Sequence, residues 1–168
     1  STDMKNWKPE KPVFDKAPEW AVKAVPGYRG HTWAPDISLH NGLYYLYYSV
    51  SAFGKNTSCI GVATNTTLNP ADPAFRWVDH GMVVQSVPGR DMWNAIDPNL
   101  IIDDSGTPWL VFGSFWDGMK LTKLDQSLIN LSEPQEWHTV AARPRDYYTV
   151  ETNAGEGAIE APFLFRKN

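Results

Sequence analysis

Two carboxylates in this chain stand just before a proline and an apolar run. Asp97 directly precedes Pro98, and Glu160 lies two positions before Pro162. A pair of carboxyl groups with room for one water between them is the machinery that cleaves a glycosidic bond with inversion, one group acting as acid and the other as base. The same residues also have a purely structural interpretation, because an Asp or Glu before a proline can cap a strand. The spacing of these motifs along the chain helps to decide between the catalytic and the structural interpretation.

The prolines recur at a nearly constant interval. Pro35, Pro98 and Pro162 are separated by 63 and 64 residues. After each of the first two prolines the pattern is strand, turn, strand, strand, and then an outer strand marked by a Trp. The expected strands cover residues 37–39, 43–50, 59–64 and 75–78, then 100–102, 109–113, 119–124 and an outer strand at Trp137. Four strands joined by up-and-down hairpins form one blade of a β-propeller.

This repeat has a consequence for the two carboxylates. Inner strands of successive blades begin at the same end of a propeller's central channel. Asp97 and Glu160 hold nearly the same place in successive repeats, so we expect both side chains to reach one pocket, which favours the catalytic interpretation. The repeat is longer than a short blade of roughly 40 to 50 residues. Long loops are therefore expected, and such loops usually carry function.

The repeat predicts a partial β-propeller over residues 1–168, with about two and a half blades. Residues 6–8 are expected to end an outer strand, residues 18–30 to form a loop, and two full blades to follow. The first strand of a further blade then ends at a hairpin tip at Asn168. Open sheet faces of this kind need covering, so a complementary chain or a second copy is the expected partner.

Composition agrees with an all-β fold. The chain has 8 Trp, 7 Tyr and 7 Phe beside 12 Gly and 13 Pro, a mixture typical of short strands joined by tight turns. A net charge of -4 and a pI near 5.5 argue against nucleic acid and anionic membranes as partners and favour a neutral ligand that binds aromatic faces. The single Cys59 excludes an internal disulfide framework and is expected to be a small buried hydrophobe.

Five stretches carry a combination of residues that is specific when taken together. They are Gly30-His31-Thr32-Trp33-Ala34-Pro35-Asp36-Ile37, Tyr44-Tyr45-Leu46-Tyr47-Tyr48-Ser49, Asn94-Ala95-Ile96-Asp97-Pro98-Asn99, Trp109-Leu110-Val111-Phe112-Gly113-Ser114-Phe115-Trp116 and Glu160-Ala161-Pro162-Phe163. Over the whole chain they resemble the endo-1,5-α-L-arabinanases of glycoside hydrolase family 43. The resemblance implies a five-bladed propeller that cleaves α-1,5-linked L-arabinan by inversion, with three carboxylates in a central cleft. We also expect a secreted or periplasmic location, although the first residues lack the features of a signal peptide.

The resemblance assigns roles to the carboxylates. Glu160 matches the general acid, which protonates the leaving oxygen. Asp97 matches the third carboxylate, which modulates the pKa of the acid and orients it through like-charge interaction. The family's general base is an Asp before a Pro in the first blade, and it is expected upstream of Ser1 because no position here matches it. Asp36 is no substitute: it follows Pro35, so strand alternation turns it away, and we expect a structural role.

Five further residues are expected to bind sugar. Trp33 resembles the residue that stacks on arabinose, and Phe53 lies in the following long loop, where the family has a second aromatic platform. Asn94 and Ser114 are expected to bind polar edges of the sugar, and Trp116 is expected to contribute a further aromatic contact. For each aromatic residue the alternative is a place in the core.

No cofactor is required for this chemistry. Family members often hold an ion, such as calcium, in the central channel through a His of a late blade. His31 is expected to be a hydrogen-bonding loop residue, and no metal ligand is assigned here. Glu156 competes for the acid role, but Glu160 has the Glu-Ala-Pro match. Two other interpretations stay open: an α-L-arabinofuranosidase or β-xylosidase of the same family, and a non-catalytic, sugar-binding half-propeller.

Overall fold

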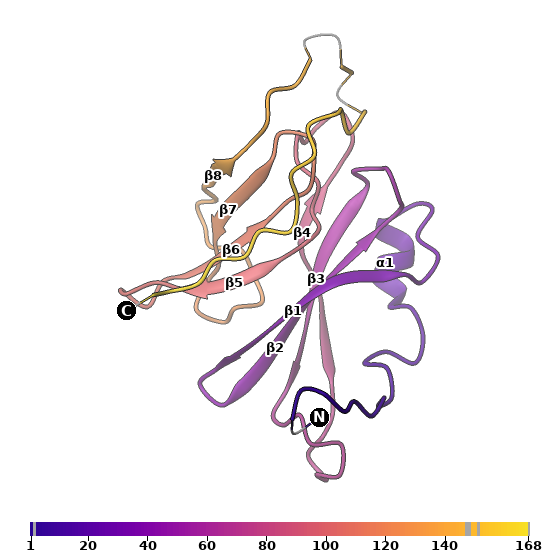
Figure 1. Ribbon diagram of the computed structural model, residues 1–168, viewed down its shortest axis with the longest axis vertical. Helices are drawn as coiled ribbons and strands as arrows, with labels where there is room; N and C mark the ends of the chain where they lie inside the picture. Colours follow the sequence, from indigo (N-terminus) through magenta and orange to yellow (C-terminus); the bar gives the residue numbers. More distant parts are fainter. Residues whose placement is uncertain (2, 147–148, 151, 168) are drawn as a thin grey trace.

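The chain folds into two four-stranded antiparallel sheets (Figure 1). The computed structural model describes residues 1, 3–146, 149–150 and 152–167. The first sheet contains β1 (Thr32–His40), β2 (Leu43–Ser51), β3 (Ser58–Asn65) and β4 (Val78–Ser86). The second contains β5 (Asn99–Ile102), β6 (Pro108–Phe112), β7 (Met119–Lys123) and β8 (Trp137–Ala141). Strands in each sheet are neighbours in chain order, and the all-β prediction is confirmed.

The repeat read from the sequence corresponds to the two sheets. Asn41 and Gly42 have positive φ values of 49° and 79°, as the favoured two-residue hairpin turn requires. Two strands were predicted with wrong bounds. The strand expected at residues 37–39 is β1, which begins at Thr32, where it already pairs with β2. The outer strand of the first sheet was expected at residues 75–78 but begins at Val78 and continues to Ser86. Antiparallel pairing with β3 sets these bounds, and local sequence does not reveal that pairing.

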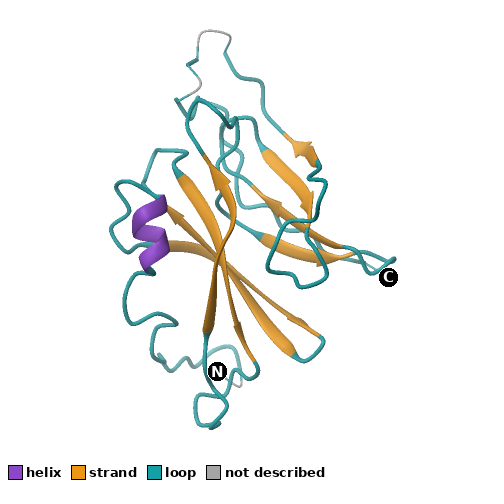
Figure 2. Ribbon diagram, turned by 180° about the vertical axis from the view of Figure 1, so that it is seen from behind, coloured by secondary structure: helices purple, strands orange, loops and turns teal. Residues whose placement is uncertain are grey.

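A short helix covers the outer face of the first sheet. Residues 18–30, predicted as a loop, contain α1 (Glu19–Ala24), and Figure 2 shows it against this sheet. Ala21 of the helix is fully buried and belongs to one apolar cluster with Tyr48 and Cys59. Such a short helix is stabilised by packing more than by propensity. Cys59 is a buried free thiol, as predicted, and burial raises its pKa to about 12.

The two ends of the described chain differ from the predicted strands. Residues 6–8 form no strand, and none of the described strands pairs with them. After Glu160 the chain is extended and lies alongside β5 (Figure 1), but it makes only an isolated bridge, between Glu160 and Ser114. A strand is stabilised by its hydrogen-bonded neighbours, which explains both differences. The hairpin tip predicted at Asn168 lies outside the described residues. No helix in the described part of the chain is long and apolar enough to cross a membrane.

The two sheets share one hydrophobic core. Tyr47 of the first sheet is fully buried, and its hydroxyl donates a hydrogen bond of 2.6 Å to the carbonyl of Leu128. Trp93 stacks on Trp137 with ring centroids 4.7 Å apart and meets Phe112 edge to face. Close packing of this kind resists small displacements. The segments that begin each repeat are therefore held in a defined relative position.

Candidate active site

The three Xaa-Pro motifs share one unusual backbone conformation. The residues that directly precede Pro35, Pro98 and Pro162 are Ala34, Asp97 and Ala161, and their φ values are 35°, 57° and 55°. A non-glycine residue in this region is strained by about 1–3 kcal/mol and persists only where the surroundings require it. Asp97 is therefore equivalent to Ala34 and Ala161. Glu160 stands one position earlier in its repeat, so the two carboxylates are neighbours in space without occupying the same place.

One cavity of about 610 Å³ collects the residues singled out from the sequence. All seven line it, and they come from five separate segments of the chain. They are Trp33, Phe53, Asn94, Asp97, Ser114, Trp116 and Glu160. The cavity is concave and mostly apolar, with a few polar groups, as small-molecule sites usually are.

Glu160 presents an exposed carboxylate at this cavity. The hydroxyl of Ser114 donates a hydrogen bond of 3.1 Å to Glu160 Oε2. The backbone N–H of Phe115 donates one of 2.8 Å to the carbonyl of Ile159. Ser114, predicted to bind substrate, is thus also a direct partner of the predicted acid and limits where its carboxylate points.

Asp97 is the more enclosed of the two carboxylates. Asp97 Oδ2 accepts a hydrogen bond of 3.1 Å from the backbone N–H of Ala161, and the Asp97 N–H donates one of 3.0 Å to the hydroxyl of Ser49. Burial raises the pKa of Asp97; the bond from Ala161 opposes this rise, and the negative charge of Glu160 adds to it. The charge of Glu160 therefore acts on Asp97 across the cavity that both residues line.

Asn94 is buried and held by a chain of hydroxyl groups. Ser58 Oγ donates a hydrogen bond of 2.6 Å to Asn94 Oδ1, and Ser51 Oγ lies 2.7 Å from Ser58 Oγ. Because Ser58 occupies the carbonyl oxygen of the side chain, the NH₂ group is what Asn94 can offer to a ligand in the cavity. Ser58 was not recognised in the sequence, where a Ser at the start of a strand carries no distinctive signal.

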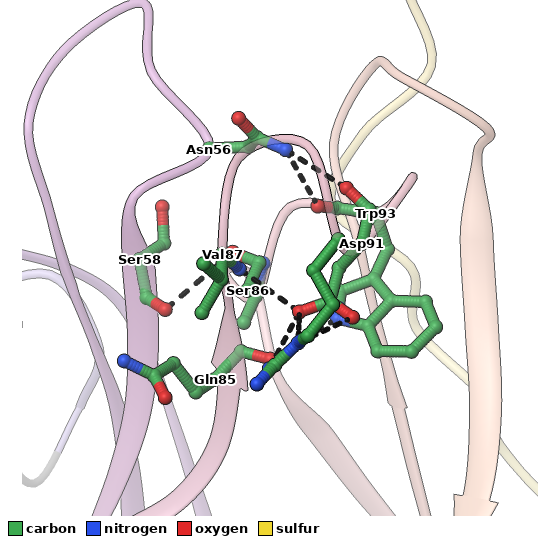
Figure 3. A network of polar contacts seen from close by, with 9 residues as sticks. Asn56, Ser58, Gln85, Ser86, Val87, Asp91 and Trp93 are labelled. Carbon is green, nitrogen blue, oxygen red and sulfur yellow. Dashed lines mark hydrogen bonds and ion pairs between the residues drawn. The ribbon is translucent and has the colours of Figure 1, made fainter. Parts of the chain in front are cut away.

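A wider polar network supports the segment that carries Asn94 (Figure 3). Ser86 Oγ donates to the carbonyl of Ser58 at 3.4 Å and accepts a bond of 3.1 Å from the N–H of Ala95. Asn56 Nδ2 donates to the carbonyl of Asp91 at 3.1 Å. Hydrogen bonds between buried polar groups such as these favour one local arrangement. The loop between β4 and β5 is thereby tied to the first sheet.

The aromatic residues form a corner at the cavity. Trp33 and Phe53 meet edge to face with ring centroids 6.3 Å apart, and Phe53 is 92% exposed. A large exposed apolar ring at the edge of a cavity marks a binding surface. Trp116 is only 4% exposed and forms part of the wall, so it offers less ring area than Phe53.

Other candidates lie elsewhere. Asp36 does not line this cavity; it accepts hydrogen bonds from Leu100 and Asn99, in agreement with the structural role predicted for it. Glu156 lines a separate hollow. His31 is exposed. Across the part of the chain that the structure describes, no group of three or more His, Cys, Asp or Glu side chains is arranged to hold a metal ion.

The cavity also contains residues that the sequence analysis missed. Lys55 and Gly54 lie in the loop that carries Phe53, and Ile96 precedes Asp97. Lys55 places an exposed cation in a cavity that holds two carboxylates. Its place two residues after Phe53 is the signal that would have identified it.

The chain belongs to glycosyl hydrolase family 43, whose profile matches residues 1–168. The family resemblance noted from the motifs is thereby confirmed. The chain is 55% identical over 167 residues to the extracellular exo-α-(1→5)-L-arabinofuranosidase ArbA of Cellvibrio japonicus, covering 99% of this chain and 48% of that protein. It is 45% identical over 168 residues to the extracellular endo-α-(1→5)-L-arabinanase 1 of Bacillus subtilis, covering 100% of this chain and 47% of that protein.

A solved structure agrees with these relatives. The α-L-arabinanase of Cellvibrio cellulosa complexed with arabinohexaose superposes with a TM-score of 0.97 at 54% identity, covering 100% of this chain and 53% of that one. The chain thus spans about half the length of the curated relatives that it matches.

Proposed function

We propose that this chain forms part of the catalytic domain of an arabinan-degrading glycoside hydrolase. The observation that carries the proposal is the single cavity lined by Glu160, Asp97, Trp33 and Phe53. Relatives named as arabinofuranosidase and arabinanase support the substrate class. In this proposal the two sheets are two blades of a five-bladed propeller, and the inner ends of both blades line the substrate cleft.

Glu160 acts as the general acid in the proposed mechanism. Its carboxyl group is exposed at the cavity and oriented by Ser114, as is required of a group that protonates the leaving glycosidic oxygen. Asp97 is the supporting carboxylate, which lines the same cavity and orients the acid through like-charge interaction. An inverting enzyme needs a base roughly 6.5–9.5 Å from the acid, with a water between them. We propose that this base lies outside the present chain.

The remaining cavity residues bind the sugar. Trp33 and Phe53 present two ring faces at right angles, suited to the apolar C–H faces of pentose rings. The NH₂ group of Asn94 donates to a ring or hydroxyl oxygen. Trp116 closes the wall, and Lys55 is available to a polar edge.

The location, cofactor requirement and partners of this enzyme follow from the same proposal. Two relatives are named as extracellular, and we propose secretion or a periplasmic location for this protein. The chemistry requires no cofactor, and a structural ion such as calcium in the central channel stays a prediction. The sheets need further propeller blades beside them, supplied by a complementary chain or a second copy. The names of the relatives support both modes of action, since one is named an exo-enzyme and the other an endo-enzyme.

The test uses a chimera in which this chain replaces the matching half of the Cellvibrio japonicus relative. With linear 1,5-arabinan as substrate, we expect the chimera to release reducing ends, and Glu160→Gln to lower kcat at least about 1,000-fold. Glu156→Gln is the matched control and is expected to retain activity, because Glu156 lies in a separate hollow. The length of the products separates exo from endo action.

Two outcomes would contradict this proposal. If the chain alone hydrolysed arabinan as fast as the chimera, the proposal that its base lies elsewhere would be wrong. If the chimera bound arabinan but turned it over no faster than its Glu160→Gln variant, the non-catalytic sugar-binding interpretation would replace the enzymatic one.

A further inference from the structure

A row of hydrogen bonds connects the three repeats beside the candidate active site. Asp36 Oδ2 accepts a bond of 3.2 Å from the backbone N–H of Leu100, and Asp36 Oδ1 accepts one of 3.2 Å from Asn99 Nδ2. Asn99 Oδ1 in turn accepts a bond of 2.8 Å from the N–H of Leu164. We call Asp36, Asn99 and these three bonds the Asp36–Asn99 relay.

The relay makes the same contact twice. Asp36 and Asn99 each directly follow the proline of their motif, while Leu100 and Leu164 each lie two positions after the proline of the next motif. In the third repeat this place belongs to Phe163, whose side chain has no polar atom. The relay therefore joins the beginnings of three successive repeats and ends at the third.

The charge of Asp36 determines which way the Asn99 amide points. A carboxylate only accepts hydrogen bonds, whereas an amide side chain both donates and accepts. With Nδ2 of Asn99 bound to Asp36, its Oδ1 faces the N–H of Leu164. Asn99 is 4% exposed. A reversed amide would set the Asn99 NH₂ group against the N–H of Leu164 and the Asn99 Oδ1 against Asp36, and would leave these groups without hydrogen-bond partners.

The relay lies next to the two carboxylates of the site. Asp97 is two residues before Asn99, and Glu160 is four residues before Leu164. We propose that Asp36 and Asn99 are positioning residues, which hold Asp97 and Glu160 in their working arrangement without touching the substrate. This inference rests on the proposed function of the site, and its test is designed so that the two can fail separately.

Exchanging the two side chains tests the relay. Asp36→Asn removes an oxygen that accepts one of two bonds, and Asn99→Asp sets two carboxylates against each other. Since a displacement of about 1 Å in a reacting group costs on the order of 100-fold, each single change is expected to lower kcat of the chimera roughly 10- to 100-fold. KM should change less than about threefold, because the sugar contacts are untouched.

The double variant Asp36→Asn/Asn99→Asp restores the pairing in the opposite sense. The amide at position 36 then donates to the carboxylate at position 99, and both backbone N–H groups keep an acceptor. We expect kcat to return to within about fivefold of the unaltered chimera. Asp104→Asn is the matched control and should leave kcat unchanged: the Asp104 side chain is 79% exposed and pairs with Arg166 at the surface.

Several results would overturn the relay. The first is a kcat that is unchanged in the single variants, and the second is a double variant whose kcat is no higher than that of the slower single variant. The third is a loss of kcat that melting curves show to result entirely from unfolding. Amide hydrogen exchange of Leu164 provides a readout that does not depend on turnover: it should be faster in each single variant and slow again in the double one. If the exchange rate of the Leu164 amide is the same in all variants, the relay is refuted. If Glu160→Gln turns over arabinan at the full rate, the proposed function is refuted, and the exchange measurement alone then decides whether the relay exists.

Discussion

The first and second Xaa-Pro motifs share a backbone but differ in chemistry. Residues 33–36 and 96–99 both turn through a left-handed residue before proline, with φ values of 35° at Ala34 and 57° at Asp97. The side chains at equivalent places differ: Trp33 corresponds to Ile96, Ala34 to Asp97, and Asp36 to Asn99. The conformation is therefore a property of the repeat, and each function depends on which side chain a given repeat places there. Substitutions that make one motif resemble the other test this separation.

The largest effect is expected when the second motif is made like the first. Asp97→Ala gives it the Ala of the first motif and removes the charge that we propose supports the acid. We expect kcat of the chimera for arabinan to fall on the order of 100- to 1,000-fold, the lower part of the range that acid–base catalysis contributes. The reverse change, Ala34→Asp, is expected neither to raise activity nor to rescue Asp97→Ala. Activity retained in Asp97→Ala would remove Asp97 from the mechanism.

The next largest effect concerns the residue two places before the proline. Trp33→Ile gives the first motif the side chain of the second and removes a ring that meets Phe53 at the cavity. Burial of such a side chain contributes about 1.5–3 kcal/mol, so KM should rise roughly 10-fold or more with little change in kcat. Trp7→Ile is the control, since Trp7 is 73% exposed and does not line the cavity. An unchanged KM would place Trp33 outside the binding surface.

A smaller effect is expected at the support of the second motif. Ser58→Ala removes the donor that holds Asn94 Oδ1, so the amide is free to turn and to lose its contact with the sugar. A hydrogen bond of this kind is worth about 0.5–1.5 kcal/mol, which corresponds to a rise in KM of roughly 2- to 12-fold. A fall in kcat at constant KM would instead assign Ser58 to the chemical step.

The smallest effect is on stability and depends on pH. The raised pKa of Asp97 means that the folded protein holds this proton more tightly than the unfolded chain. Its ionisation therefore costs stability as the pH rises above 3.8, the ordinary value for Asp. Asp97→Asn removes this cost, so the variant is expected to melt at a higher temperature than the unaltered chimera at pH 7. The gap should close below pH 3.8, and a gap independent of pH would contradict the assignment.

Much of the fold was predictable because strands and turns leave local patterns in the sequence. The prolines at intervals of 63 and 64 residues and the Asn41-Gly42 turn marked the repeat and its hairpins. What failed depended on partners: β4 takes its bounds from β3, α1 is held by the sheet, and residues 6–8 have no described strand beside them. Local sequence does not specify which strands and segments pair with one another.

The candidate site divides in the same way. Residue types and their spacing identified Asp97 and Glu160 as candidates, because carboxylates before a recurring proline are visible in the sequence. The resemblance to the arabinanases added Trp33 and Phe53. The repeat predicted that the two carboxylates reach one pocket. Only the tertiary structure decided that the aromatic residues line the same cavity, that Asp97 is equivalent to Ala34 and not to Glu160, and that Ser58 holds Asn94. These facts join residues tens of positions apart. They follow from how the two sheets pack around a common core, which no short stretch of sequence contains.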